Sequence, residues 1–113
     1  MKIIDVDTRT TEIVSRLRDA TERYSWRDED GRELYEARKI AEALKIEYKS
    51  GLTADLPEGW KKKRFIFAKG WRSIVLLYIT REAVEMWATM APGVRSVEVR
   101  RVLSERLATV AAK

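Results

Sequence analysis

The sequence contains no cysteine and no histidine among its 113 residues. Without cysteine the chain has no disulfide, no thiolate nucleophile and no zinc–thiolate site. Without histidine it lacks the usual general base and the commonest transition-metal ligand. Asparagine and glutamine are also absent, whereas arginine, lysine and glutamate are abundant. Loss of heat-labile amides with a gain of charge is typical of hyperthermophile proteins, so we expect a heat-loving, archaeal-like source.

Long hydrophobic runs are absent as well. The longest one covers residues 74–79, whereas a membrane-spanning helix needs ~20 apolar residues. The first residues, MKIIDVD, carry acids where a signal peptide would need its apolar stretch. We therefore expect no transmembrane helix and a cytoplasmic location.

Recognisable catalytic motifs are missing too, since the chain has no dinucleotide-binding glycine motif, Walker loop or nucleophile elbow. Two acid clusters remain. Asp5 and Asp7 stand at the end of an expected strand and offer too few oxygens for a hard cation. Residues 28–31 begin like a calcium loop, but its twelfth position is Lys39 instead of an acid. We predict no metal, no cofactor, no small-molecule substrate and no enzymatic activity.

The composition that remains is that of a globular protein. Apolar residues make up 45% of the chain, charged residues 36%, and there are only two prolines. A chain of this length fits one compact core, so the sequence predicts a single domain over residues 1–113.

The first half of the chain alternates between extended and helical patterns. Residues 2–6 are β-branched and predict a short strand, and apolar residues at helical spacing then predict a helix over 8–24. Asp30 with Glu33 resembles a capping box, which predicts a second helix that ends near Glu47. Residues 51–59 lack periodicity and predict a loop.

The second half begins with a hairpin signal. Residues 64–68 and 72–79 are rich in β-forming side chains and flank a short connection, which predicts two antiparallel strands. Thr80 is expected to cap a third helix, and Ser96 to start a fourth. The expected order is β-α-α-β-β-α-α, an α+β fold in which a small antiparallel sheet packs with four helices.

The six apolar residues at 74–79 do not alternate with polar ones. Such a run is typical of a central strand with both faces covered. Either the four helices cover both faces, or a second copy of the chain completes one of them. A homodimer is therefore one of our expectations.

Charge is distributed unevenly along the chain. Residues 1–59 carry 11 basic and 14 acidic side chains, whereas residues 60–113 carry 12 basic and 4 acidic ones, so the net charges are −3 and +8. The basic balance belongs to the second half. A basic region with interspersed aromatic residues is typical of a nucleic-acid interface.

Basic and aromatic residues coincide in the segment GWKKKRFIFAKGWR, at residues 59–72. Cations neutralise phosphates, while aromatic rings stack on unpaired bases. We predict that this segment, extended by arginines of the last helix, binds nucleic acid or another anionic partner. The predicted site comprises Trp60, Lys61, Lys62, Lys63, Arg64, Lys69, Trp71, Arg72, Arg95, Arg100 and Arg101, with Arg106 as a further candidate.

Two alternatives stay open beside this prediction. In the first, the four cations only protect a sheet edge, and Phe65, Phe67 and the tryptophans pack in the core. In the second, the chain is a protein-interaction or assembly module, an accessory subunit of a larger complex or filament. The −3 half of one copy then faces the +8 half of another, or an acidic protein surface.

Overall fold

The structure is a computed structural model that describes residues 6–67, 73–91 and 99–105, the side chains of residues 6–9 excepted. The elements, in chain order, are α1 (Val6–Arg23), β1 (Ser25–Arg27), β2 (Glu33–Glu36), α2 (Ala37–Leu44), α3 (Ser50–Ala54), the 3-10 turn η1 (Glu58–Trp60), β3 (Lys61–Phe67), β4 (Ser73–Ile79) and α4 (Arg81–Met90). Residues 99–105 are also helical. The mixture of helices with one small antiparallel sheet confirms the predicted α+β class.

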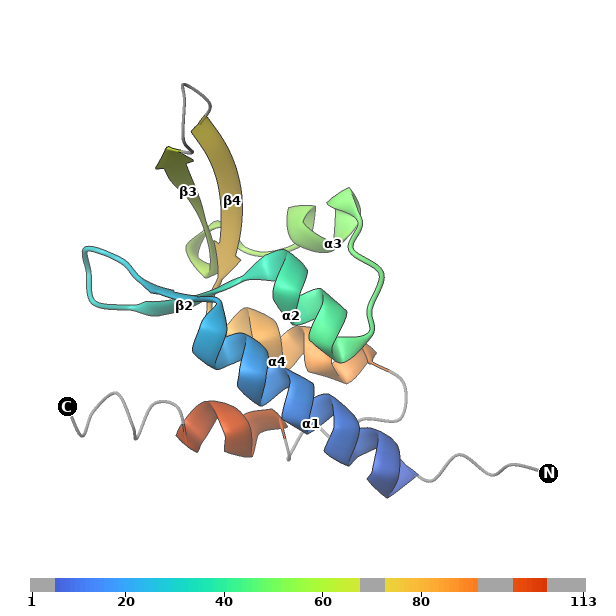
Figure 1. The fold of residues 1–113 in the computed structure, drawn as a ribbon. Helices are drawn as coiled ribbons and strands as arrows, with labels where there is room; N and C mark the ends of the chain where they lie inside the picture. The colour runs from blue at the N-terminus through green and yellow to red at the C-terminus, as the bar shows by residue number, and fades with distance from the viewer. Residues whose placement is uncertain (1–5, 68–72, 92–98, 106–113) are drawn as a thin grey trace.

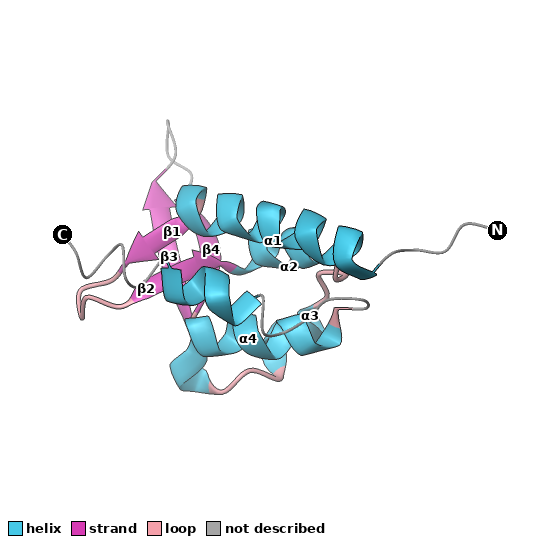
Figure 2. Ribbon diagram, turned by 90° about the horizontal axis from the view of Figure 1, so that it is seen from below, coloured by secondary structure: helices cyan, strands magenta, loops and turns pink. Residues whose placement is uncertain are grey.

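The sheet has four strands in the order β1-β2-β4-β3, and every neighbouring pair is antiparallel. It lies at one end of the molecule, and α1, α2 and α4 extend from it side by side (Figures 1 and 2). The β3–β4 hairpin is much longer than the β1–β2 hairpin. Its far end therefore rises beyond the helices (Figure 1).

The hydrophobic core lies between the helices and the sheet. Trp87 of α4 is completely buried, and Ile40 of α2 and Leu17 of α1 are buried with it. The sheet contributes Tyr35 and Ile79, which oppose each other across β2 and β4. Val99 and Leu103 bring the last helical segment into the same core. Removal of this apolar surface from water is the main force that holds the layers together.

Within the described residues, no helix is both long enough and apolar enough to cross a membrane, as the sequence predicts.

Two predicted helices are confirmed at the positions that the apolar periodicity gives. Helix α1 covers residues 6–23, close to the expected 8–24, and its residue Val6 is helical instead of extended. The rest of the strand predicted over 2–6 lies outside the described residues. Helix α4 begins after Thr80, whose side-chain oxygen accepts the backbone N–H of Ala83 at 3.4 Å, as expected of an N-cap.

The second helix begins later in the structure than the sequence predicts. Residues 25–36 form a β-hairpin, and α2 starts only at Ala37. Asp30 is no helix cap, because the Asp28 carboxylate accepts the backbone N–H groups of Asp30 and Arg32 and so closes a turn. Gly31 takes the positive φ of 80° that this turn requires. Capping-box residues and turn residues are of the same types, so the local pattern did not separate them.

The end of α2 and the following segment also differ from expectation. Lys45 adopts the left-handed conformation and ends the helix two residues before the predicted Glu47. The predicted loop over 51–59 contains the short helix α3 and the 3-10 turn η1. The fourth helix is confirmed for residues 99–105, where Val99, Val102 and Leu103 are buried, while Ser96 lies outside the described residues.

Candidate nucleic-acid interface

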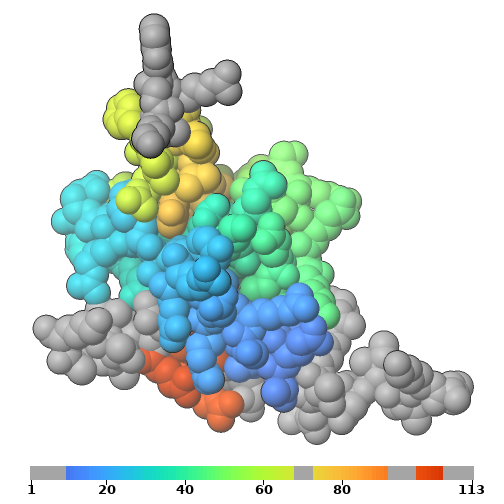
Figure 3. Space-filling model, viewed as in Figure 1, coloured from blue at the N-terminus to red at the C-terminus, as the bar shows by residue number. Residues whose placement is uncertain are grey.

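The predicted hairpin is present and divides into two parts. Among the described residues, β2 pairs with β4 only at Tyr78 and Ile79, and from Leu77 outward β4 pairs with β3 alone. We call residues 61–62 and 78–79 the base, and residues 63–67 and 73–77 the arm. The arm is a two-stranded ribbon that projects above the helical body, as the space-filling view shows (Figure 3). Two exposed strands of this kind gain little stability on their own, so the base must hold the arm.

The arm carries different side chains on its two faces. Lys63, Phe65 and Phe67 alternate along β3 and share one face with Val75, which lies opposite Phe65. We call these four residues the ring face. Phe65 is 65% exposed and Phe67 is 85% exposed. At the base, the same face of the hairpin carries Ile79 and packs on the core, so the ring face continues the core-facing side beyond the helices.

Lys61 is the first of the four consecutive cations and belongs to the base. Its side chain is only 18% exposed, and its Nζ donates to the carbonyl oxygen of Thr53 at 3.1 Å. The same ammonium pairs with Glu58 at 3.6 Å. Lys61 therefore anchors β3 to the end of α3 and to η1.

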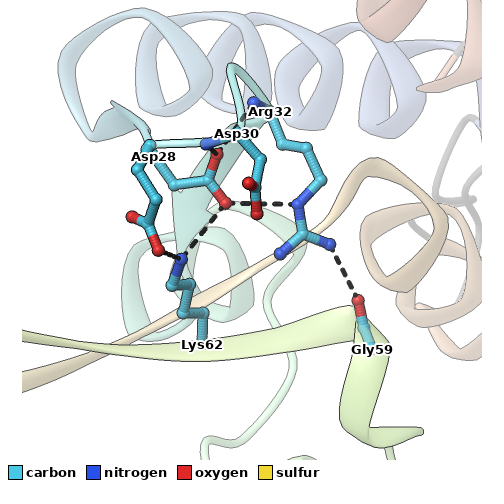
Figure 4. A network of polar contacts seen from close by, with 6 residues as sticks. Asp28, Asp30, Arg32, Gly59 and Lys62 are labelled. Atoms are coloured by element: carbon cyan, nitrogen blue, oxygen red, sulfur yellow. Dashed lines mark hydrogen bonds and ion pairs between the residues drawn. The ribbon is translucent and has the colours of Figure 1, made fainter.

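Lys62 joins β3 to the β1–β2 turn through two carboxylates. Its ammonium donates to Oδ2 of Asp28 at 3.4 Å and to the carboxylate of Glu29 (Figure 4). Arg32 closes the network, because it donates to Asp28 at 3.2 Å and to the carbonyl oxygen of Gly59 at 3.2 Å. This network holds the two hairpins together at the base.

The network shifts the pKa values of its members. Burial is the largest single influence on the pKa of Asp28 and raises it, but hydrogen bonds from Arg32 and Lys62 together bring the pKa below its usual value. The hydrogen bond from Lys62 lowers the pKa of Glu29, and the same hydrogen bond raises the pKa of Lys62. All three groups are therefore held in their charged forms.

Arg64 lies on the face of the hairpin opposite the ring face. Its guanidinium stands 5.1 Å from the ring centroid of Trp26 and 5.8 Å from that of Tyr78, and it donates to the Tyr78 hydroxyl at 3.4 Å. The two rings meet edge to face, with their centroids 5.3 Å apart. Cation–π contacts of this kind fix Arg64 over the β1–β2 hairpin. Trp26, which stands in a charged stretch of sequence, thus has a structural role at the base.

Lys63 differs from its three neighbours. Its side chain is exposed, and within the described part of the chain it forms no ion pair or side-chain hydrogen bond. The sequence has no acidic residue between Gly59 and Arg81, so the hairpin itself supplies nothing to neutralise this charge. Lys63 is therefore the cation of the described arm that is most available to an anionic partner.

The remaining predicted site residues are not brought together with the arm. Trp60 is half-buried against the core, and its carbonyl oxygen accepts the N–H of Thr80 at 2.9 Å. Arg100 and Arg101 are exposed on the helical segment 99–105, which lies on the side of the body away from the arm (Figure 1). Five further candidates lie outside the described residues: Lys69, Trp71, Arg72, Arg95 and Arg106.

Two residues that the predicted site leaves out are exposed in the structure. Phe65 and Phe67 are expected only in the core, yet they are the most exposed of the large hydrophobic side chains described. The helices do not cover both faces of the outer half of β4, because Ile74 and Val75 are each 48% exposed, and coverage of this part by a second copy stays a prediction. One signal was present in the sequence: Lys61 and Lys63 share the face of Phe65, and a strand face that carries cations is not wholly buried.

Within the described residues, no group of three or more acidic side chains is placed to hold a metal ion. A largely apolar pocket of about 540 Å³ lies between α3 and α4. Ile46, Leu52, Met86, Trp87 and Met90 supply the apolar part of its lining, and Glu47, Lys49, Ser50 and Asp55 supply the polar part.

Comparison with protein-family models, with curated proteins and with solved structures found no match to this chain.

Proposed function

We propose that this protein is a non-enzymatic binder of single-stranded nucleic acid and that the ring face of the arm is its contact surface. The observation that carries the proposal is the pair of exposed phenyl rings, Phe65 and Phe67, in line with the exposed Lys63. An isolated exposed phenylalanine is ordinary, but two on one strand face of a projecting ribbon form a platform.

The chemistry of the platform fits unpaired bases better than a duplex. Bases stack on aromatic rings when they are not already stacked in a helix, and each stacked base contributes about 1–3 kcal/mol. Lys63 precedes the rings on the same face and can neutralise a phosphate of the strand that they hold. Stacking does not depend on base identity, so we expect weak sequence preference.

The base of the hairpin supports this role indirectly. Lys62 is tied to Asp28 and Glu29, and Arg64 is held over Trp26 and Tyr78. These contacts fix the direction in which the arm leaves the body. A platform that is already in place loses less conformational entropy when the ligand binds.

The test is a fluorescence-anisotropy titration with labelled single-stranded and double-stranded DNA and RNA. We expect saturable binding of single strands, and a loss of affinity of at least about tenfold in the Phe65→Ala/Phe67→Ala double variant. The matched control is Ile66→Ala/Ile74→Ala, which removes apolar side chains from the opposite face of the same ribbon. Phe65→Leu/Phe67→Leu keeps apolar surface without the rings and should also lose affinity.

Two results would contradict the proposal. One is the absence of binding to any single strand even at low salt, where phosphate contacts are strongest. The other is equal loss of affinity in the ring-face variant and in its control, since stacking would then not explain binding.

A second candidate function is that of a protein-interaction or assembly module. It is favoured by the apolar side chains on both faces of the arm and by the outer edge of β3, with which no strand of the described residues pairs. A cytoplasmic location and a heat-loving source remain predictions from the sequence.

A further inference from the structure

Strand β3 is an edge strand of the sheet. In the described part of the chain, β3 pairs only with β4, and no strand pairs with its outer side. An edge strand presents unpaired N–H and C=O groups to any strand that can reach them. Proteins usually blunt such an edge with charge or proline, but the outer half of β3 reads Phe-Ile-Phe.

The hydrogen-bond pattern of the hairpin identifies which backbone groups face this edge. The N–H of Thr80 donates to the carbonyl oxygen of Trp60, so the pair 60 and 80 belongs to the hydrogen-bonded kind. Such pairs recur at every second position, and the even-numbered residues of β3 therefore bond to β4. Lys63, Phe65 and Phe67 then direct their N–H and C=O groups outward.

We propose that a second copy of this chain adds its own β3 antiparallel to this edge, with Phe65 opposite Phe65 of the second copy. The two four-stranded sheets then become one continuous sheet about a two-fold axis. The outward groups of residues 63, 65 and 67 pair with those of 67, 65 and 63 of the second copy. The outward N–H and C=O groups of each copy are then hydrogen-bonded to those of the other copy.

The distribution of charge along β3 selects this arrangement. Its first four residues are cations and its last three are apolar. Parallel pairing in register would set lysine against lysine, which is destabilising. Antiparallel pairing about Phe65 instead sets Lys63 opposite Phe67 and Arg64 opposite Ile66, so every cation in the overlap meets an apolar side chain.

Neighbouring registers of the same antiparallel pair are less favourable. Pairing about Arg64 would place two guanidinium groups directly opposite each other. Pairing about Lys63 would do the same with two ammonium groups, and like charges in this position are destabilising. Both of these registers also extend the overlap toward more lysines. Pairing about Ile66 would limit the overlap of β3 to residues 65–67, whereas the register about Phe65 pairs residues 63–67, sets the rings side by side and separates the cations.

The second copy is favoured over an unrelated partner because the strand is complementary to itself in this way. Residues on one face of a strand stay on one face of the extended sheet, so the ring faces of the two copies would lie side by side. The inference goes beyond nucleic-acid binding and does not depend on it.

The first test is sedimentation of purified protein without nucleic acid, at concentrations from low to high micromolar. The wild type should show a reversible monomer–dimer equilibrium. Ile66→Lys places a cation opposite Arg64 of the second copy at two symmetric positions, and we expect it to weaken the dimer several-fold. Ile66→Glu places an anion at the same positions and should strengthen the dimer.

Both variants change the same partly exposed residue, so a general effect of its loss would move them in the same direction. A wild type that stays monomeric at high micromolar concentration would overturn the inference. So would a dimer to which both substitutions make no difference, or the same difference. Ile66→Lys adds positive charge to the arm, so any nucleic-acid binding should not weaken with the dimer, and the two proposals can fail separately.

The second test uses the absence of cysteine from the chain. Phe65→Cys puts a single thiol at the two-fold axis, where the paired Cα atoms lie within disulfide range of the thiol of the second copy. In this register Phe67→Cys thiols stand four residues apart along the strands, too far to bond. Mild oxidation should therefore cross-link the position-65 variant much faster.

Position 67 is the more exposed of the two in the monomer, at 85% against 65%, so random collision would favour its cross-linking instead. Equal or faster cross-linking at position 67 would overturn the proposed register.

Discussion

The base and the arm of the β3–β4 hairpin are parts of the same two strands, yet they use similar residues in opposite ways. In the base, Lys61 and Lys62 are tied to carboxylate and carbonyl oxygens, and Ile79 is fully buried. In the arm, Lys63, Ile74 and Phe67 are all exposed. Residue type therefore does not set the role of a side chain in this hairpin. What sets it is whether the neighbouring strand β2 and the helices reach that position.

The largest effect should come from two isoleucines of β4 that differ only in this respect. Ile79→Ala removes a fully buried side chain from the core and should lower the free energy of unfolding by about 2–5 kcal/mol. Ile74→Ala truncates a side chain that is 48% exposed and should cost less than about 1 kcal/mol. Urea denaturation measures both. Similar losses would mean that a partner covers this face of the arm in solution.

A smaller effect is expected at the network that joins the base to the β1–β2 turn. Asp28→Ala removes the acceptor for two backbone N–H groups and for the side chains of Arg32 and Lys62. Its urea midpoint should fall well below that of the wild type. The control is Asp30→Ala, at an exposed residue of the same turn, which should leave the midpoint nearly unchanged. The prediction fails if the two variants are equally stable.

The same network should make stability depend on pH. The pKa values of Asp28 and Glu29 lie below their ordinary values of 3.8 and 4.5, so the unfolded chain binds more protons than the folded protein as the pH falls through this range. Their contribution to stability is complete above about pH 5 and is lost progressively as the pH falls through the lowered folded-state values. The free energy of unfolding, measured from pH 7 to pH 3, should fall less steeply in Asp28→Ala.

The smallest expected effect is a difference in the salt dependence of binding between Lys63 in the arm and the two lysines of the base. If all three lysines contacted phosphates, their combined neutralisation would flatten the slope of log affinity against log salt by roughly two to three units. The structure assigns Lys61 and Lys62 to contacts within the molecule. Lys63→Ala should therefore reduce the slope by slightly under about one unit, and Lys62→Ala should lower stability with little change in slope. The reverse pattern would locate the contact at the base.

The elements that could be predicted from the sequence are those fixed by local periodicity. Apolar spacing located α1 and α4, the Thr80 cap located the start of α4, and the two β-rich runs located β3 and β4. The hairpin at residues 25–36 could not be predicted in this way, because its turn is closed by Asp28. This residue contacts Arg32 nearby and also Lys62, which is distant in sequence. A local sequence pattern does not reveal the contact with Lys62.

The sequence locates the segment that forms the candidate site, but it does not show which side chains of this segment are exposed to a partner. Lys63 and Lys62 are identical and adjacent, and only the position of Asp28 and Glu29 decides that Lys62 is engaged. Phe65 and Phe67 do have the parity of core residues, as the alternation predicts. They are exposed because β3 is longer than β2 and extends past the helices, and the extent of one element relative to another is a tertiary property.

The early end of the β2–β4 pairing has a consequence for local unfolding. Among the described residues, the N–H groups of Ile74 and Leu76 depend on β3 alone, so the ribbon can open without opening the core. Hydrogen–deuterium exchange should then differ within a single strand, fast at Ile74 and Leu76 and slow at Tyr78 and Ile79. A partner bound to the arm would have to slow the exchange at Ile74 and Leu76, whichever molecule it is. Binding of a partner to the arm can therefore be detected from the exchange rates of the amide protons of the hairpin.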